Sequence, residues 1–171
     1  METWDAIRAR RNVRQYTDQP ITREDLERIC EAGRRSPSSR NWQPWDFVVV
    51  TDRVRLVELA KVWQGGQHVA RSAATIALVG AEPRDQRERD WVQYDFGQAT
   101  AHMMLAAADL GIGSGHSAVA DQAQAQRVLG FPDGHHCAYL IGLGYPADRP
   151  LRPLRRPARR PFDEVVHWER W

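Results

Sequence analysis

At 171 residues, with 42% hydrophobic and 27% charged residues, the chain fits one domain that buries a sizeable core. Its 24 basic and 22 acidic residues nearly balance, and no run approaches the roughly 18 apolar residues of a membrane span. Residues 1–5 lack the features of a signal peptide, so we expect a cytoplasmic protein with no membrane partner. Two cysteines without a C-x-x-C pair argue against a disulfide framework and a cysteine zinc site.

The first predicted element is a helix over residues 3–11, capped by Thr3, with Trp4 and Ile7 on an inward face. Guanidinium and amide groups cluster where this helix ends, at Arg10, Arg11, Asn12 and Arg14. Guanidinium forks suit a phosphate group. Cations at a helix C-terminus also complement the helix dipole, which is the alternative explanation for the first two arginines.

A second helix is predicted to follow Thr22 and to end near Arg35. The loop after it is polar and stiffened by prolines, and it offers hydrogen-bonding groups for the edge of a flat heterocycle at Pro37, Ser38, Ser39, Asn41 and Gln43. A phosphate subsite followed by such a loop suggests a nucleotide ligand.

The next predicted elements are a buried strand over residues 45–50, a helix capped by Asp52 and a second strand over residues 75–80. The mixed charges of residues 84–90 indicate a solvated surface stretch.

A long helix is predicted over residues 91–110, and its apolar second half indicates a central position that ends at Gly111. The glycine-rich stretch 111–117 allows a close backbone approach to a ligand, and a simple turn is the alternative. A helix over residues 121–129 and a third strand over residues 137–142 complete the predicted core.

From residue 145 onward, prolines and arginines alternate, and such a C-terminal arm, residues 145–171, cannot form a core of its own. The aromatic residues in its last part, 162–171, need burial, and docking on a partner subunit is one solution. The basic run 149–160 is the one feature that suits a nucleic acid, but the acidic residues that follow it argue against that partner.

Five pieces of the chain occur in an order that resembles the FMN-dependent nitroreductase family. They are an R-R-x-x-R element at residues 10–14, P-S-S-x-N-x-Q-P-W at 37–45, the alanine-rich helix that ends at Gly111, I-G-L-G-Y-P at 141–146, and R-R-P-F-D-E-V-V-H-W at 159–168. The resemblance covers nearly the whole chain.

This resemblance implies an α+β fold in which a mainly antiparallel central sheet is wrapped by helices. It also implies an intertwined homodimer with two FMN molecules at its interface, in which residues 1–171 form one nitroreductase-like domain and residues 145–171 are its extended arm. Family members reduce nitroaromatics, quinones or related small molecules with hydride from NADH or NADPH, passed through FMN in a ping-pong mechanism.

Carried over by position in the motifs, the residues expected to bind FMN are Arg10, Arg11, Asn12, Arg14, Pro37, Ser38, Ser39, Asn41, Gln43, His116, Ser117 and Arg159. The resemblance places the phosphate at Arg10 and Arg159 and the flavin pyrimidine edge at Arg14. It assigns Pro37, Ser38, Ser39 and Asn41 to the flavin of the other subunit, and support of the loop is the alternative role for Gln43. No catalytic side chain is named, because the protein mainly supplies position and charge to the flavin.

Two departures from the family pattern bear on the pocket. Asn12 stands where serine is common, and only residues 81–90 replace a helical excursion that covers the substrate in longer members. The pocket is therefore expected to be open, or to be walled by Trp42, Trp63 or Trp91.

On the sequence alone, a protein that stores or senses FMN without turnover is an alternative, as is a specialised flavin dehydrogenase or dehalogenase. No metal site is expected, because the six histidines include no i, i+4 pair on a helix.

Overall fold

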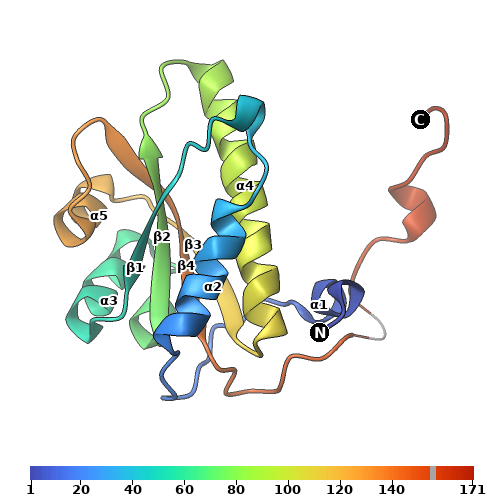
Figure 1. Ribbon diagram of the computed structural model, residues 1–171, viewed down its shortest axis with the longest axis horizontal. Coiled ribbons are helices and arrows are strands. Elements are labelled where there is room, and N and C mark those ends of the chain that lie inside the picture. Colours follow the sequence, from blue (N-terminus) through green and yellow to red (C-terminus); the bar gives the residue numbers. More distant parts are fainter. Residues whose placement is uncertain (155–156) are drawn as a thin grey trace.

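The computed structural model describes residues 1–154 and 157–171, and its centre is one four-stranded antiparallel sheet with helices on both faces (Figure 1). The strands lie in the spatial order β1-β2-β4-β3 and are β1 (Asp46–Val50), β2 (Ala74–Ala81), β3 (Gly113–Ala118) and β4 (His135–Gly144). The helices are α1 (Thr3–Ala9), α2 (Arg23–Arg34), α3 (Arg53–Leu59), α4 (Gln86–Asp109) and α5 (Gln122–Leu129). The predicted α+β fold, with a mainly antiparallel sheet wrapped by helices, is confirmed.

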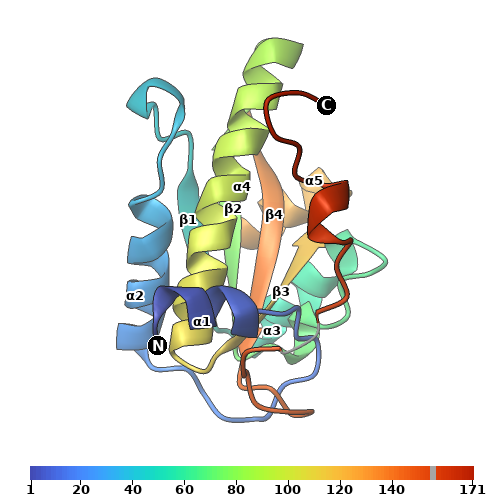
Figure 2. The same cartoon turned by 90° about the vertical axis from the view of Figure 1, so that its right-hand side faces the viewer.

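Alternation along β2 divides the core into two layers. Ile76 and Leu78 pack in the cluster formed with α2 and α4, whereas Ala77 and Val79 pack in the cluster formed with α3 and α5. Helix α4 lies along the face of the sheet that Ile76 and Leu78 occupy, and it buries Phe96 completely, as expected for a central helix (Figure 2). Each large apolar side chain buried in this way contributes about 1.5–3 kcal/mol to stability.

Local sequence signals set the ends of several helices. Thr22, Asp52 and Asp121 cap α2, α3 and α5 by accepting hydrogen bonds from backbone amides of the first turn. Gly111 and Gly130, both with φ of +74°, adopt the left-handed conformation that ends α4 and α5.

The first helix differs from its prediction. It ends at Ala9, and its N-cap is Glu2 without a side-chain hydrogen bond. Trp4 and Ile7 are 67% and 45% exposed, so their predicted inward face is wrong; the buried positions of this short helix carry small alanines instead.

In the glycine-rich stretch 111–117, Gly111 lies in the turn that ends α4, and residues 113–117 belong to strand β3 and not to a turn. A Cβ atom at Gly113 would lie 2.7 Å from Val13 Cβ, and one at Gly115 would lie 2.5 Å from the Val13 carbonyl oxygen. Glycine is needed here because the segment after α1 packs directly on β3, and this removes the usual sequence signal of a strand. Helix α4 also begins earlier than predicted, at Gln86, inside the mixed-charge stretch.

The C-terminal arm leaves the sheet as an extended segment that carries one short 3₁₀ turn, Phe162–Glu164, in its described part (Figure 2). Phe162, Trp168 and Trp171 are 68%, 77% and 100% exposed on it. Arg155 and Arg156, which belong to the basic run, lie outside the described residues. Within residues 1–154 and 157–171, no helix has the length and apolar character needed to cross a membrane.

Candidate functional site

A cavity of about 660 Å³, here called the α1–α4 cavity, is bounded by α1, α4, the strands β3 and β4, and the arm. Its polar lining includes Arg10, His116 and Arg159, which come from distant parts of the sequence. Its other lining residues are Ile7, Gln93, Gly97, Thr100, Ala101, Met104, Leu105 and Tyr139. The cavity therefore combines two guanidinium groups with a largely apolar wall.

Each polar residue is placed by its backbone. Arg10 directly follows α1, and its amide donates to the Ala6 carbonyl oxygen at 2.9 Å. The arm approaches the same helix, because Leu154 N donates to the Arg8 carbonyl oxygen at 3.2 Å. His116 is the exposed residue between buried neighbours of β3, as the alternation of a strand dictates.

These residues fit the FMN that the sequence led us to expect. Two guanidinium groups suit a phosphate, and the apolar wall suits a flat ring. The buried Thr100 hydroxyl lines the cavity and has no hydrogen-bond partner among the residues that the structure describes. A ligand oxygen or nitrogen would satisfy it.

The other members of the first arginine motif lie near the cavity without lining it. Arg11 donates to Asp148 Oδ1 at 2.7 Å and to the Arg149 carbonyl oxygen at 2.8 Å. These bonds connect the start of the arm to the segment that follows α1. The hydrogen bond from Arg11 lowers the pKa of the Asp148 carboxyl. Asn12 pairs with β3 through its backbone, and the side chain of Arg14 is exposed.

The buried His68 and the half-buried Tyr16 support β3 and the segment around Arg14. His68 Nε2 lies 3.1 Å from the Gly115 carbonyl oxygen, which fits a proton on that nitrogen. Burial lowers the pKa of His68, and the positive charge of Arg14 lowers it further. The Tyr16 hydroxyl lies 2.8 Å from the Val13 carbonyl oxygen and 3.0 Å from that of Gly142, and burial raises the pKa of this phenol.

The loop 37–43 has an unusual backbone. Arg40, Asn41 and Gln43 have φ of +54°, +58° and +54°, a region that costs non-glycine residues of order 1–3 kcal/mol each. The conformation is held by Ser39 N, which donates to Asp95 Oδ2 of α4 at 2.9 Å, and by Gln43 N, which donates to Ser38 Oγ at 2.9 Å. Asp95 is completely buried, so the loop is tied to α4 through a carboxylate shielded from solvent.

The loop and the α1–α4 cavity lie on opposite sides of α4. Trp91 faces the loop and Thr100 lines the cavity, and nine residues at 3.6 per turn place them half a turn apart. Figure 1 shows the loop beside the first turns of α4, away from α1. The chain thus brings Arg10, His116 and Arg159 together but does not bring them to Pro37, Ser38, Ser39, Asn41 or Gln43. Ser117 is buried and donates to the Ala118 carbonyl oxygen at 3.1 Å.

Several lining residues of α4 were not predicted from the sequence. Gln93, Gly97 and Ala101 recur at intervals of four, which places them on one face of the helix. This stripe of small and polar residues was the sequence signal for a ligand-facing side of α4. It was overlooked because most residues of the second half of the helix are apolar. Tyr139 of β4 gave no local signal, because strand pairing alone places it opposite Ala118, two residues along β3 from His116.

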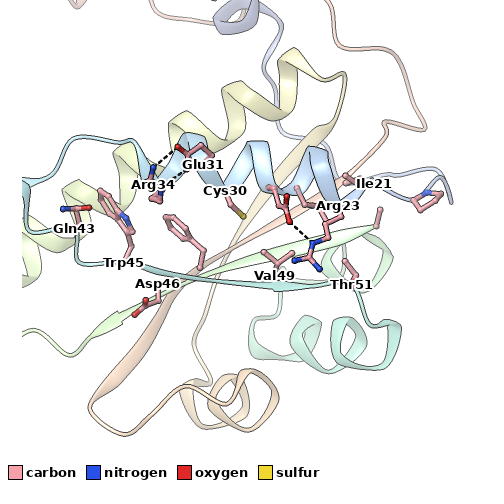
Figure 3. Close-up of a pocket in the computed structure, with 15 residues that line it drawn as sticks. Ile21, Arg23, Cys30, Glu31, Arg34, Gln43, Trp45, Asp46, Val49 and Thr51 are labelled. Carbon is pink, nitrogen blue, oxygen red and sulfur yellow. Dashed lines mark hydrogen bonds and ion pairs between the residues drawn. The ribbon is translucent and has the colours of Figure 1, made fainter.

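A larger cavity, about 1050 Å³, lies between α2 and β1 and is here called the α2–β1 groove (Figure 3). Cys30, Trp45, Phe47 and Val49 are among its apolar lining, and ion-paired charges such as Glu31 with Arg34 lie at its rim. In the described part of the chain, β1 pairs only with β2, so its outer edge is open. The groove therefore offers an apolar floor beside an unpaired strand edge.

Comparisons with known proteins agree on one family. The family model described as the nitroreductase family matches residues 7–67 and 56–145. A protein of Archaeoglobus fulgidus, provisionally named NADH dehydrogenase/NAD(P)H nitroreductase, is 33% identical over 170 residues, which covers 96% of each chain. The NADPH-flavin oxidoreductase of Vibrio harveyi is 30% identical over 179 residues, covering 96% of this chain and 72% of the relative. A solved structure of NADPH:FMN oxidoreductase from Vibrio harveyi, complexed with NAD⁺, superimposes with a TM-score of 0.83 at 26% identity, covering 97% of this chain and 76% of that one.

Proposed function

Because the chain belongs to the nitroreductase family, we propose that it is an FMN-dependent oxidoreductase that uses NADH or NADPH. The acceptor would be a nitroaromatic, a quinone or a related small molecule, reduced by a ping-pong mechanism. The observation that carries the proposal is the meeting of Arg10 and Arg159 beside an apolar wall in one cavity. The relatives named for flavin and nicotinamide nucleotides support the same pair of cofactors.

When bound, FMN would supply the ring that takes hydride from the nucleotide and passes it to the acceptor. Arg10 and Arg159 would hold the phosphate, and each charge-assisted hydrogen bond contributes about 1.5–3 kcal/mol. Ile7, Met104 and the rest of the apolar wall would exclude water from the ring. Arg14 would place a positive charge where negative charge develops on the ring, as the resemblance implies.

We further propose that the protein acts as a homodimer. One chain separates the loop 37–43 from the α1–α4 cavity, and a second subunit would bring its own loop to that cavity. The exposed aromatic residues of the arm support the same arrangement. The apolar floor of the α2–β1 groove, shown in Figure 3, supports it too. The arm of one subunit would lie in the groove of its partner beside the open edge of β1.

The cofactor proposal is tested by FMN titration of the apoprotein, followed by flavin fluorescence. Arg10→Ala should weaken FMN binding about 10-fold or more, because it removes a charge-assisted contact. Arg8→Ala is the matched control, since Arg8 is an exposed arginine of α1 that does not line the cavity. Equal affinities of Arg10→Ala and wild type would refute the assignment.

The reductase proposal is tested by steady-state NAD(P)H oxidation with a nitrofuran or a quinone as acceptor. The holoenzyme should exceed the rate of the same concentration of free FMN. A rate no higher than that of free FMN would reject turnover and favour flavin storage or sensing.

A further inference from the structure

A third cavity, of about 520 Å³, lies between the loop 37–43 and the first turns of α4. We call it the Trp42–Trp91 cavity, and its lining is Ser39, Arg40, Trp42, Arg84, Asp85, Arg87, Glu88 and Trp91. It combines three guanidinium groups with two indole rings. Neither the α1–α4 cavity nor the α2–β1 groove shares these arginines.

Arg40 and Arg87 are both held by the indole of Trp91. Their guanidinium carbons lie 5.8 Å and 4.6 Å from the centroid of the Trp91 ring, so two cations share one aromatic side chain. Arg40 is brought there by its positive φ in the loop that Asp95 holds. Both guanidinium groups are thus positioned before any ligand arrives, which lowers the entropic cost of binding.

The acidic residues of the cavity are already engaged within α4 and the residues that precede it. Arg84 Nε donates to Glu88 Oε2 at 2.6 Å, and Asp85 Oδ1 accepts from Glu88 N at 2.8 Å as the helix cap. In the described chain, Arg40 and Arg87 form no ion pair with an acidic residue. With Arg84 paired to Glu88, the charges of Arg40 and Arg87 outweigh the one remaining carboxylate, Asp85, so the cavity carries a net positive charge.

We propose that the Trp42–Trp91 cavity binds the adenosine 2′-phosphate of NADPH and gives the protein a preference for NADPH over NADH. A phosphate monoester carries about −1.5 to −2 charges at neutral pH, and paired guanidinium forks match it. Trp42 is 45% exposed and lines the cavity, so its indole can stack with adenine. NADH lacks the 2′-phosphate, so it gains nothing from Arg40 and Arg87.

This inference rests on the proposed function, and the position of the cavity agrees with it. The cavity shares Ser39 with the loop that would reach the partner's α1–α4 cavity in the homodimer. A donor held here by its phosphate end would extend its nicotinamide toward that flavin. The phosphate end of the donor would then lie in the Trp42–Trp91 cavity of one subunit, and its nicotinamide would lie at the α1–α4 cavity of the partner.

The first test compares kcat/KM for NADPH and NADH in the holoenzyme. Arg87→Ala should lower kcat/KM for NADPH about 10-fold or more and leave kcat/KM for NADH unchanged, and Arg40→Ala should lower the ratio of the NADPH value to the NADH value. Arg89→Ala is the control, because Arg89 is an exposed arginine of α4 outside the cavity. Equal use of both donors by the wild type, or an equal loss for both donors in the variants, would overturn the inference.

The second test measures binding without turnover, by titrating tryptophan fluorescence with 2′,5′-ADP and with 5′-AMP, which lacks the 2′-phosphate. The wild type should bind 2′,5′-ADP at least 10-fold more tightly, and Arg87→Ala should abolish the difference. If 2′,5′-ADP shows this advantage while neither donor is oxidised, the proposed function fails and the phosphate site stands. If NADH is oxidised but 2′,5′-ADP shows no advantage, this inference alone fails.

Discussion

Replacing Asp95 with alanine should release the loop 37–43 and destabilise the protein. The buried carboxylate accepts hydrogen bonds from Ser39 N at 2.9 Å and from Gln98 Nε2 at 3.2 Å. Bonds to a charged group contribute about 1.5–3 kcal/mol each, but the half-buried Gln98 can turn to water. We therefore expect the free energy of unfolding to fall by about 2–4 kcal/mol, which lowers Tm by roughly 4–16 °C in a chain of this size.

Two assays separate local release of the loop from general destabilisation. Thermal unfolding followed by circular dichroism gives the change in Tm. Limited trypsin digestion reports the loop itself, because the exposed Arg40 becomes cleavable when the tie from Ser39 to Asp95 is lost. Gln98→Ala is the comparison; it removes the 3.2 Å bond to Asp95 and the 3.4 Å bond to the Pro37 carbonyl oxygen but keeps the tie from Ser39 N, and it should cost less than about 1 kcal/mol. A Tm of Asp95→Ala within 2 °C of wild type, with unchanged cleavage at Arg40, would refute the role assigned to this carboxylate.

Four further outcomes are expected. Burial lowers the folded-state pKa of His68 below its unfolded value of about 6.5. The free energy of unfolding should therefore decrease as pH falls below about 6.5, because the unfolded chain binds a proton that the folded chain does not. His68→Phe should flatten the dependence of Tm on pH. Gly115→Ala should destabilise the protein by about 1–3 kcal/mol in urea unfolding, because its Cβ would lie 2.5 Å from a carbonyl oxygen. Gly97→Ala is the control and should not destabilise the protein, because its Cβ would meet nothing within 4 Å. Arg14→Ala should lower the midpoint potential of bound flavin in a spectroelectrochemical titration; an unchanged potential would remove Arg14 from the flavin. Deletion of residues 162–171 should convert dimers to monomers in light scattering, and a deletion variant that stays dimeric would disprove docking of the arm.

The caps of α2 and α3 and the apolar runs of the core strands were predictable because they depend on neighbours in sequence, whereas the predicted cap at Thr3 was wrong. Thr22, Asp52 and Asp121 occupy N-cap positions whose hydrogen bonds lie within one turn, so the sequence carries the full signal. The same holds for the apolar runs that became β2 and β4, since burial on both faces needs continuous apolar residues.

Features that depend on distant contacts were not predictable. Strand β3 was missed because the close approach of Val13, which lies far away in sequence, requires glycine at positions 113 and 115. The exposure of Trp4 and Ile7 follows from how α1 meets α4, and periodicity cannot distinguish a core face from a ligand-facing or subunit-facing one.

The candidate site likewise combines features that local motifs predict with features that depend on distant contacts. Arg10 and Arg159 were expected to act together from their motifs, and the structure places both at one cavity. The pairing of Arg11 with Asp148 has no signal in the sequence, because it joins residues at opposite ends of the chain. The side of α4 on which each cavity opens is likewise decided by packing, not by any local motif.

The flavin assignment is tested most directly by the visible absorption spectrum of the purified protein, recorded anaerobically before and after addition of NADPH or NADH. We predict oxidised-flavin bands that bleach with a nicotinamide nucleotide and return when a quinone is added. A colourless protein that also fails to take up added FMN would contradict the proposed function.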